Sequence, residues 1–269
     1  MPKPARYTHG HHDSVLRSHR WRTAENSAAY LLDELSAGQD LLDVGCGPGT
    51  ITCDLAERVS PGRTVGMDAA EGVLAEARAA AAERGVRIEF EQGDIYDLRF
   101  QDSTFDVVHA HQVLQHLSDP VAALREMRRV CRSGGVVAAR DGDFEAFTWF
   151  PADPALDRWL ELYRQVARSN NAEPDAGRRL LHWAHAAGFT DVRATSSVWC
   201  FATPEDRAWW GGLWAERVTA SGSSLGQQMT ERGLATAAER EEIAAALHRW
   251  AESPDGWFAV LHGEILART

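Results

Sequence analysis

LLDVGCGPGT, residues 41–50, is the stretch that decides the fold. A short apolar run ends in Asp43, and glycines follow at positions 45, 47 and 49. A turn this rich in glycine after a buried strand allows a ligand to approach the backbone closely. The stretch therefore predicts a strand, a ligand-binding loop and the start of a helix, in that order.

Strand and helix patterns alternate on the C-terminal side of this stretch. The expected strands are 40–45, 63–68, 86–94, 104–110 and 134–140. The expected helices between them are 49–59, 71–85 and 119–131. Alternation with short loops predicts right-handed crossovers and a parallel sheet, so the fold class is α/β.

The flanking segments differ in character from this core. We expect a polar arm and one long helix over 15–35 before the first strand. After the core, we expect helices at 154–168, 176–189, 204–220 and 237–251, and strands at 191–203 and 256–268. The predicted organisation is an arm and lid helix at 1–37, a core at 38–145, a helical acceptor-side segment at 146–190, and a last part at 191–269 with a helical insertion at 204–251.

Composition excludes several classes of protein. With a formal net charge of −11 over 269 residues, the chain lacks the clustered basic residues that general nucleic-acid binding needs. No apolar run approaches the length needed to span a membrane. The four cysteines form no CxxC pair, which predicts reduced thiols and a cytoplasmic protein. The histidine-rich stretches HGHH (9–12) and HAHQVLQH (109–116) lack the supporting ligands of a metal site, so we expect no metal.

Three kinds of ligand compete for the glycine loop. A phosphate-binding P-loop needs a lysine that is absent here. The dinucleotide pattern GxGxxG places its third glycine where this chain has Thr50, and Asp43 would repel a pyrophosphate that it faced. A ligand with positive charge fits better, because a carboxylate at the loop supports it. S-adenosylmethionine carries both an ammonium and a sulfonium group.

Two further carboxylates end the next two strands. Asp68 stands where an acidic residue grips the two ribose hydroxyls. Asp94 follows in QGDI, where it can accept a hydrogen bond from an adenine amino group while Ile95 packs on the ring. Acidic residues at three successive strand ends indicate an adenosyl ligand more specifically than the loop alone.

The motifs LLDVGCGPGT, VGMD, QGDI and FDVVHAHQVLQHLSDP together resemble those of class I S-adenosylmethionine-dependent methyltransferases, in particular the ubiquinone/menaquinone-biosynthesis branch. The resemblance covers residues 41–140. It implies a Rossmann-like seven-stranded sheet in the order 3-2-1-4-5-7-6 with strand 7 antiparallel, an N-terminal helical lid and a helical insertion. It also implies methyl transfer to a small-molecule acceptor, of aromatic or specialised-metabolite type.

The resemblance also assigns positions in the cofactor site. It implies Gly45, Cys46 and Gly47 at the methionine portion, Asp68 and Ala69 at the ribose, Asp94 and Ile95 at the adenine, and Ala110 and His111 on the sulfonium side. Asp43 beside the loop, with Tyr7 and Thr23 from the arm and first helix, completes the set of candidate cofactor-binding residues. For Asp43, a turn carboxylate that never touches ligand is the alternative.

The candidate catalytic residues follow the fourth and fifth strands, where an acceptor would lie. His111, Asp141 and Asp143 could orient the acceptor or take its proton. The alternative for the two aspartates is a solvated acidic turn shaped by Gly142. Two other functions stay open at this point: a dinucleotide-dependent oxidoreductase and a non-catalytic cofactor-binding regulator. The oligomeric state is not predicted.

Overall fold

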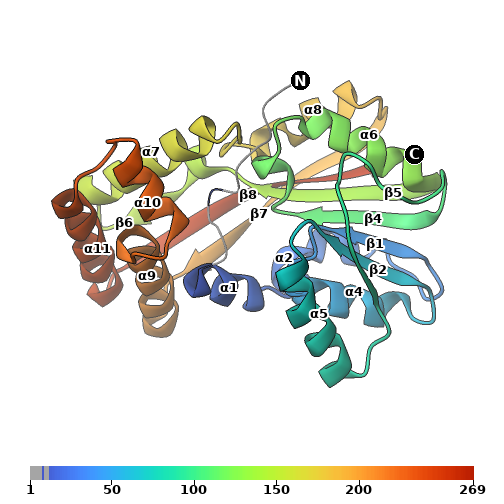
Figure 1. Ribbon diagram of the computed structural model, residues 1–269, viewed down its shortest axis with the longest axis horizontal. Helices are drawn as coiled ribbons and strands as arrows, with labels where there is room; N and C mark the ends of the chain where they lie inside the picture. The colour runs from blue at the N-terminus through green and yellow to red at the C-terminus, as the bar shows by residue number, and fades with distance from the viewer. Residues whose placement is uncertain (1–7, 9–11) are drawn as a thin grey trace.

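The computed structural model describes residues 8 and 12–269, which form a sheet covered by helices on both faces (Figure 1). The strands are β1 (Leu41–Val44), β2 (Thr64–Asp68), β3 (Glu89–Gln92), β4 (Phe105–His111), β5 (Cys131–Gly142), β6 (Thr148–Phe150), β7 (Asp191–Phe201) and β8 (Trp257–Arg268). The α-helices are α1 (Asp13–Arg20), α2 (Ala24–Ser27), α3 (Ala29–Leu32), α4 (Thr50–Val59), α5 (Glu71–Arg84), α6 (Pro120–Val130), α7 (Pro154–Ser169), α8 (Leu180–Ala186), α9 (Pro204–Thr219), α10 (Ser224–Glu231) and α11 (Ala237–Glu252). Short 3₁₀ helices are η1 (Leu114–His116), η2 (Phe144–Ala146) and η3 (Gly177–Arg179).

The predicted strand order is confirmed. The strands β3, β2, β1, β4 and β5 are parallel neighbours, and β8 pairs antiparallel with β5. On its other edge β8 pairs with β7, so β7 and β8 take the places expected for strands 6 and 7. The short strand β6, which the sequence did not predict, continues the line of β5 along β8.

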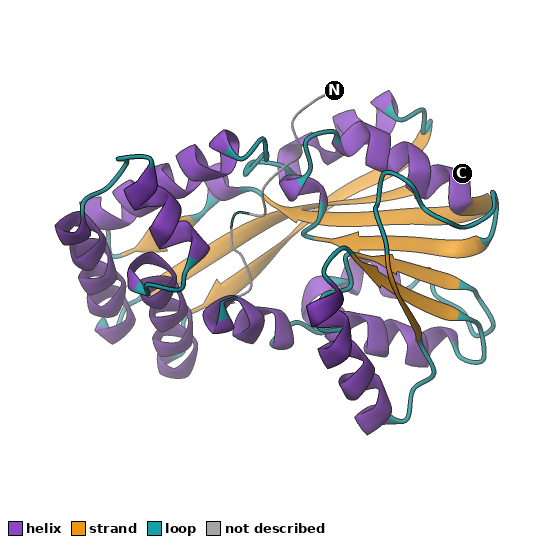
Figure 2. Ribbon diagram, in the orientation of Figure 1, coloured by secondary structure: helices purple, strands orange, loops and turns teal. Residues whose placement is uncertain are grey.

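The helices form two layers and a lobe (Figures 1 and 2). The helices α6 and α8 cover one face of the sheet, and α4 and α5 lie on the other. We call α7, α9, α10, α11 and β6 the helical lobe; they gather around the ends of β7 and β8 that project beyond the parallel strands (Figure 1). The region 204–251 was expected to hold two helices, but it holds three, and α10 is the one that was not predicted.

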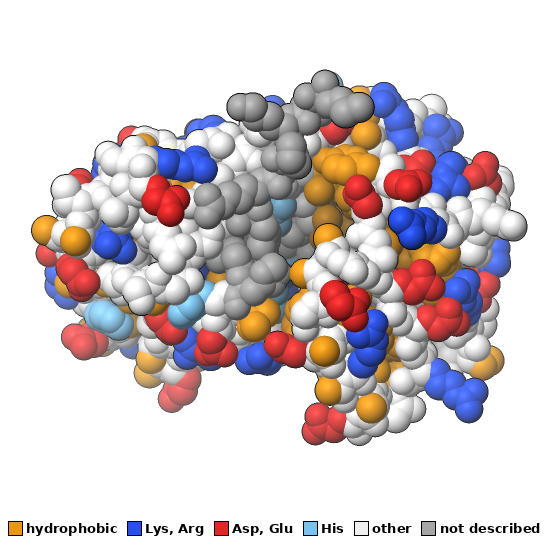
Figure 3. Space-filling view, viewed as in Figure 1, with side chains coloured by type: hydrophobic (Ala, Val, Ile, Leu, Met, Phe, Trp, Pro, Cys, Tyr) orange, Lys and Arg blue, Asp and Glu red, His pale blue; other side chains and the backbone are white. Residues whose placement is uncertain are grey.

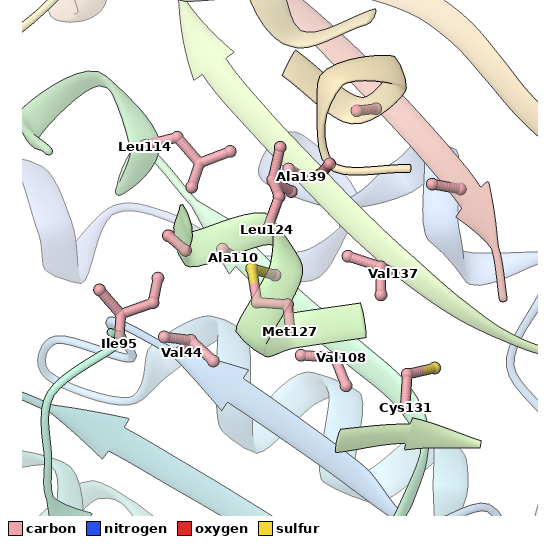
Figure 4. Close-up of a cluster of buried hydrophobic side chains, with 14 of the residues drawn as sticks. Val44, Ile95, Val108, Ala110, Leu114, Leu124, Met127, Cys131, Val137 and Ala139 are labelled. Atoms are coloured by element: carbon pink, nitrogen blue, oxygen red, sulfur yellow. The ribbon is translucent and has the colours of Figure 1, made fainter. Parts of the chain in front are cut away.

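The core between the sheet and α6 consists of buried apolar side chains. Val44 from β1, Val108 and Ala110 from β4, and Leu124 and Met127 from α6 meet there (Figure 4). These side chains are at most 1% exposed. Burying a leucine or methionine side chain contributes about 1.5–3 kcal/mol, so this layer fixes the ends of β1 and β4 relative to each other.

The prediction of one long N-terminal helix is wrong. The chain forms α1, α2 and α3 instead, with a break at residues 21–23. Thr23 stands at the N-cap of α2, where its hydroxyl accepts a hydrogen bond from the Asn26 N–H and the Asn26 side chain accepts one from the Thr23 N–H. This reciprocal capping starts a new helix. Residues 21–23 therefore separate α1 from α2 and end the continuous helix that the sequence predicts.

The glycine loop follows β1 as predicted. Gly45, Gly47 and Gly49 adopt φ of 72°, 55° and 80°, in the left-handed region that favours glycine. A Cβ on Gly45 would lie 2.4 Å from Val113 Cγ2. The loop thus brings the backbone close to the segment after β4 and delivers the chain into α4.

Candidate active site

A cavity of about 940 Å³ lies at the carboxyl ends of β1, β2 and β4 and extends toward the helical lobe. It has two parts that differ in chemistry. We name the two parts after the ligands that the sequence leads us to expect in them. The cofactor half is lined by the glycine loop and the residues that follow β2 and β3. The acceptor half is lined by the aromatic wall, which we define as Trp21, Phe144, Phe147, Trp199, Trp209, Trp210 and Trp214.

Asp68 joins the glycine loop to the turn after β2. Its Oδ2 accepts a hydrogen bond from the Gly47 N–H at 3.0 Å, and its Oδ1 accepts one from the Ala70 N–H at 2.9 Å. Each carboxylate oxygen can accept more than one hydrogen bond. The side chain therefore shapes the loop and keeps acceptor capacity for hydroxyl groups in the cavity that it lines.

Asp43 also lines the cavity but is almost fully buried, with 3% of its surface exposed. Its Oδ2 accepts a hydrogen bond from the Thr52 hydroxyl at 2.5 Å, and its Oδ1 lies 2.7 Å from His109 Nδ1. A carboxylate that accepts from imidazole places the proton on Nδ1. Asp43 is thus held by α4 and β4 and contributes negative potential to the cofactor half.

The far end of the cofactor half is formed after β3. Asp94 lines the cavity, and its Oδ1 accepts a hydrogen bond from the Tyr96 N–H at 2.9 Å. Ile95 also lines the cavity and is 8% exposed. A carboxylate beside an apolar side chain suits a flat ring that carries an amino group.

The aromatic wall is built by segments that lie far apart in the sequence. Trp21, in the break between α1 and α2, has its ring centroid 5.2 Å from that of Trp199 on β7 and 5.2 Å from that of Trp209 on α9. Phe144 stacks on Phe147 at 4.4 Å. Aromatic faces of this kind bind flat apolar molecules and exclude water.

His111 lies where the two halves meet. It ends β4, lines the cavity and has its ring centroid 5.8 Å from that of Trp199. It is 6% exposed, and neither ring nitrogen has a hydrogen-bond partner among the described residues. Burial, and then the positive charges of Arg22 and Arg140, lower the pKa of His111 well below its usual value. The ring is therefore neutral near pH 7 and can accept a hydrogen bond from a ligand.

Gln112, the next residue, has a left-handed φ of 54° and links three elements. Arg22 Nη2 donates to Gln112 Oε1 at 2.7 Å, so the Gln112 amide nitrogen must face His262 Nε2, 2.8 Å away. His262 Nε2 then accepts, and its Nδ1–H donates to the Val260 carbonyl at 3.0 Å. This chain fixes the neutral tautomer of His262, whose pKa burial also lowers. The sequence carried no signal for Gln112 or His262.

The helix α1 spans from the cofactor half to the acceptor half. Arg20 donates to Glu76 on α5 at 2.9 Å, and Arg17 pairs with Glu216 on α9. The α1 residues that line the cavity are Val15, Leu16, Ser18 and His19. This helix therefore forms part of the cavity wall and joins the cofactor side to the helical lobe.

Comparisons with known proteins agree with this geometry. A family model described as a methyltransferase domain matches residues 42–139. An uncharacterized methyltransferase of Schizosaccharomyces pombe is 34% identical over 97% of this chain and 95% of its own. The chain belongs to the class I S-adenosylmethionine-dependent methyltransferases. Its cofactor is S-adenosylmethionine.

Two further comparisons support the branch and the fold of this methyltransferase. A ubiquinone/menaquinone biosynthesis C-methyltransferase of Bdellovibrio bacteriovorus is 39% identical over 38% of this chain and 43% of its own. The YcgJ protein from Bacillus subtilis has the same fold, with a TM-score of 0.59 and 21% identity over 91% of this chain and 98% of its own. Neither the oxidoreductase nor the regulator alternative finds support among these relatives.

Some predicted site residues of the methyltransferase lie elsewhere. Ala110 is fully buried in the core against α6 and does not line the cavity (Figure 4). Neighbouring strand residues point to opposite faces, so Ala110 and His111 do not share the site. The Thr23 side chain is exposed and caps α2. Tyr7 lies outside the described residues.

The two aspartates predicted to be catalytic form hydrogen bonds with other protein groups and lie outside the cavity lining. Asp141 is fully buried, accepts a hydrogen bond from the Gln115 N–H at 3.0 Å, and has its pKa raised to about 7 by burial. Asp143 is 1% exposed and forms a two-pronged ion pair with Arg178 at 2.7 Å. Neither lines the cavity, and the alternative of a solvated turn is wrong as well.

The described residues contain no cluster of three or more His, Cys, Asp or Glu side chains able to hold a metal ion. None of their helices is long and apolar enough to cross a membrane. On the face drawn in Figure 3, basic and acidic side chains are interspersed, so that face carries no continuous basic stripe.

The lowered pKa of His111 predicts a pH dependence of stability. The unfolded state binds a proton at His111 below about pH 6.5, whereas the folded state does not until lower pH. Stability is therefore full above about pH 6.5 and falls as the pH drops. His111→Gln should flatten the slope of unfolding free energy against pH below this value by up to about 1.4 kcal/mol per pH unit.

Urea unfolding of the wild type and His111→Gln between pH 5 and pH 8 measures this difference. His182→Gln, on the exposed side of α8, is the control. Parallel curves for the wild type and His111→Gln would mean that His111 takes up its proton in the folded protein.

Proposed function

We propose that this methyltransferase transfers the methyl group to a flat, apolar small-molecule acceptor held against the aromatic wall. The observation that carries the proposal is the division of one cavity into a carboxylate-lined half and an aromatic half that meet at His111. A donor in the first half and an acceptor in the second would have their reacting atoms beside this histidine.

The cofactor half fits S-adenosylmethionine by its chemistry. We assign Gly45, Cys46 and Gly47 to the methionine portion, because backbone without bulky side chains borders the cavity there. The negative potential of Asp43 favours the ammonium and sulfonium groups. Bound in this half, S-adenosylmethionine supplies an activated methyl group on its sulfonium.

We assign the remaining cofactor contacts to the residues after β2 and β3. Asp68 would accept from the ribose hydroxyls with the lone pairs that its bonds to Gly47 and Ala70 leave over, beside Ala69. Asp94 would accept from the adenine amino group, and Ile95 would pack on the ring.

The protein's own contribution to the reaction is mainly alignment. Holding two reactants in register lowers the barrier by about 7–11 kcal/mol in favourable cases, and the aromatic wall excludes water that would compete. His111 would accept a hydrogen bond from the acceptor atom. Because its pKa is lowered, this ring orients the acceptor better than it stores a proton.

We also propose that α1 acts as a lid, since its side chains form part of the cavity wall and its arginines reach both sides. The acceptor is a small molecule, and we infer neither a nucleic-acid nor a membrane partner. The free cysteines of the described chain, three of them buried, support a cytoplasmic location.

The assignment of Asp68 predicts a loss of cofactor affinity. Asp68→Asn removes the charge and one acceptor, at a cost of about 1–3 kcal/mol. The dissociation constant for S-adenosylhomocysteine, measured by calorimetry, should rise about tenfold or more. Asp97→Asn, an exposed change outside the cavity, should leave it unchanged. Wild-type affinity in Asp68→Asn would remove Asp68 from the site.

The lid proposal predicts a separate loss. Deleting residues 1–20 removes α1 and opens both halves to water, so affinity for S-adenosylhomocysteine should fall while the circular dichroism spectrum keeps its strand contribution. Arg20→Met, which removes the pair with Glu76 and the longer contact with Asp13 within α1, should have a smaller effect. A truncated protein with full affinity would show that α1 does not cover the cofactor.

A further inference from the structure

The carboxylates that line the cavity all lie in one of its two halves. Among the described lining residues, the carboxylates are Asp43, Asp68 and Asp94, and all three belong to the cofactor half. The acceptor half contains two arginines, Arg22 and Arg217, and no described acidic side chain, whereas a third lining arginine, Arg99, follows β3 on the cofactor side. Residues 1–12 contain no aspartate or glutamate, so the undescribed part of the chain adds no carboxylate.

Both arginines lie against the aromatic wall. The Arg22 guanidinium carbon is 5.6 Å from the centroid of the Trp199 ring, and that of Arg217 is 4.7 Å from the centroid of the Trp214 ring. Arg217 is 4% exposed. Guanidinium groups stay charged in proteins and bind carboxylates, phenolates and similar oxyanions with two parallel N–H groups.

The described hydrogen bonds of these arginines involve uncharged groups. Arg22 donates to the Gln112 amide oxygen at 2.7 Å, and Arg217 donates to the Ser14 carbonyl at 2.8 Å and the Ser18 hydroxyl at 2.6 Å. These contacts hold the guanidinium groups in place and leave their positive charge. The acceptor half is therefore a cationic space walled by aromatic rings, in which electrostatic attraction is stronger than in water.

The histidines that line the cavity near the acceptor half carry no charge near neutral pH and so add nothing to its electrostatic potential. Burial lowers the pKa of His116 to about 3 and that of His111 well below its usual value. The deeper arginine, Arg140, is already paired with Glu264 at 3.2 Å. The positive potential of the acceptor half thus comes from Arg22 and Arg217 near neutral pH.

We propose that the acceptor is an aromatic anion, with its ring on the aromatic wall and its ionised oxygen group toward Arg22 and Arg217. The proposal rests on the assignment of the aromatic half to the acceptor, made above. It narrows the substrate class from flat apolar molecules to flat molecules that carry a phenolate, enolate or carboxylate.

A matched pair of fluorescent probes tests this directly. 1-Anilinonaphthalene-8-sulfonate and N-phenyl-1-naphthylamine share one aromatic skeleton and differ in the sulfonate. Both probes are titrated in the presence of saturating S-adenosylhomocysteine. The cofactor half is then occupied, so that the sulfonate of the anionic probe cannot bind in the place of the cofactor carboxylate. The anionic probe should bind with one-to-one stoichiometry and about tenfold tighter than the neutral probe.

Variants separate charge from shape. Arg217→Met and Arg22→Met should each weaken the anionic probe about tenfold and the neutral probe by less than about twofold. Arg58→Met, an exposed change on α4 outside the cavity, should affect neither. Equal affinities of the two probes, or equal losses of both probes in the two variants, would overturn the proposal, since the arginines would then only hold α1. If neither probe binds, the aromatic acceptor site itself is wrong.

Discussion

The pairing of β7 with β8 is the constraint on which the rest of the molecule depends. It runs along all eleven residues of β7. One end of this ribbon belongs to the main sheet, where Ile265 and Ala267 pack in the core with α6 and α8. The other end carries Phe258 and Val260 into the helical lobe. One continuous ribbon therefore sets the aromatic wall at a fixed position relative to the ends of β1 and β4.

Polar side chains on one face of the sheet support the floor of the cavity. Asp43 lies opposite His109, and Arg140 lies opposite Glu264 on the neighbouring strand. Burying a charge without a partner is costly, and a good partner offsets most of that cost. His111, next to Arg140 in register, is different because no described residue bonds its ring nitrogens. In the proposed function, the acceptor would supply the missing hydrogen bond.

The core could be predicted because local rules agree there. The glycines after β1 need left-handed backbone, and strand–helix alternation permits few topologies. The position of Ala110 could also have been corrected from the sequence, since it and His111 are consecutive on a strand. The aromatic wall could not be predicted in detail. Its members come from residues 21, 144–147, 199 and 209–214, and only the abundance of tryptophan after residue 148 pointed to it.

The break in the N-terminal helix shows how tertiary contacts override helical periodicity. Residues 21–23 sit inside an apparently continuous helical pattern, yet Trp21 turns toward Trp199, and the Trp199 indole N–H donates to the Asn26 carbonyl at 2.6 Å. Similarly, Asp143 was expected at the acceptor site or, as the alternative, in a solvated turn, but Arg178 from a distant segment draws it into a buried ion pair. Such partners cannot be read from local sequence.

The central claim is that one cavity holds the donor at its carboxylate-lined half and the acceptor at its aromatic half. A crystal structure with bound S-adenosylhomocysteine tests it most directly. The account predicts the ribose against Asp68, the adenine beside Asp94 and Ile95, and the sulfur facing His111, with the aromatic wall left open. An adenosine stacked on the aromatic wall, or bound outside this cavity, would contradict it.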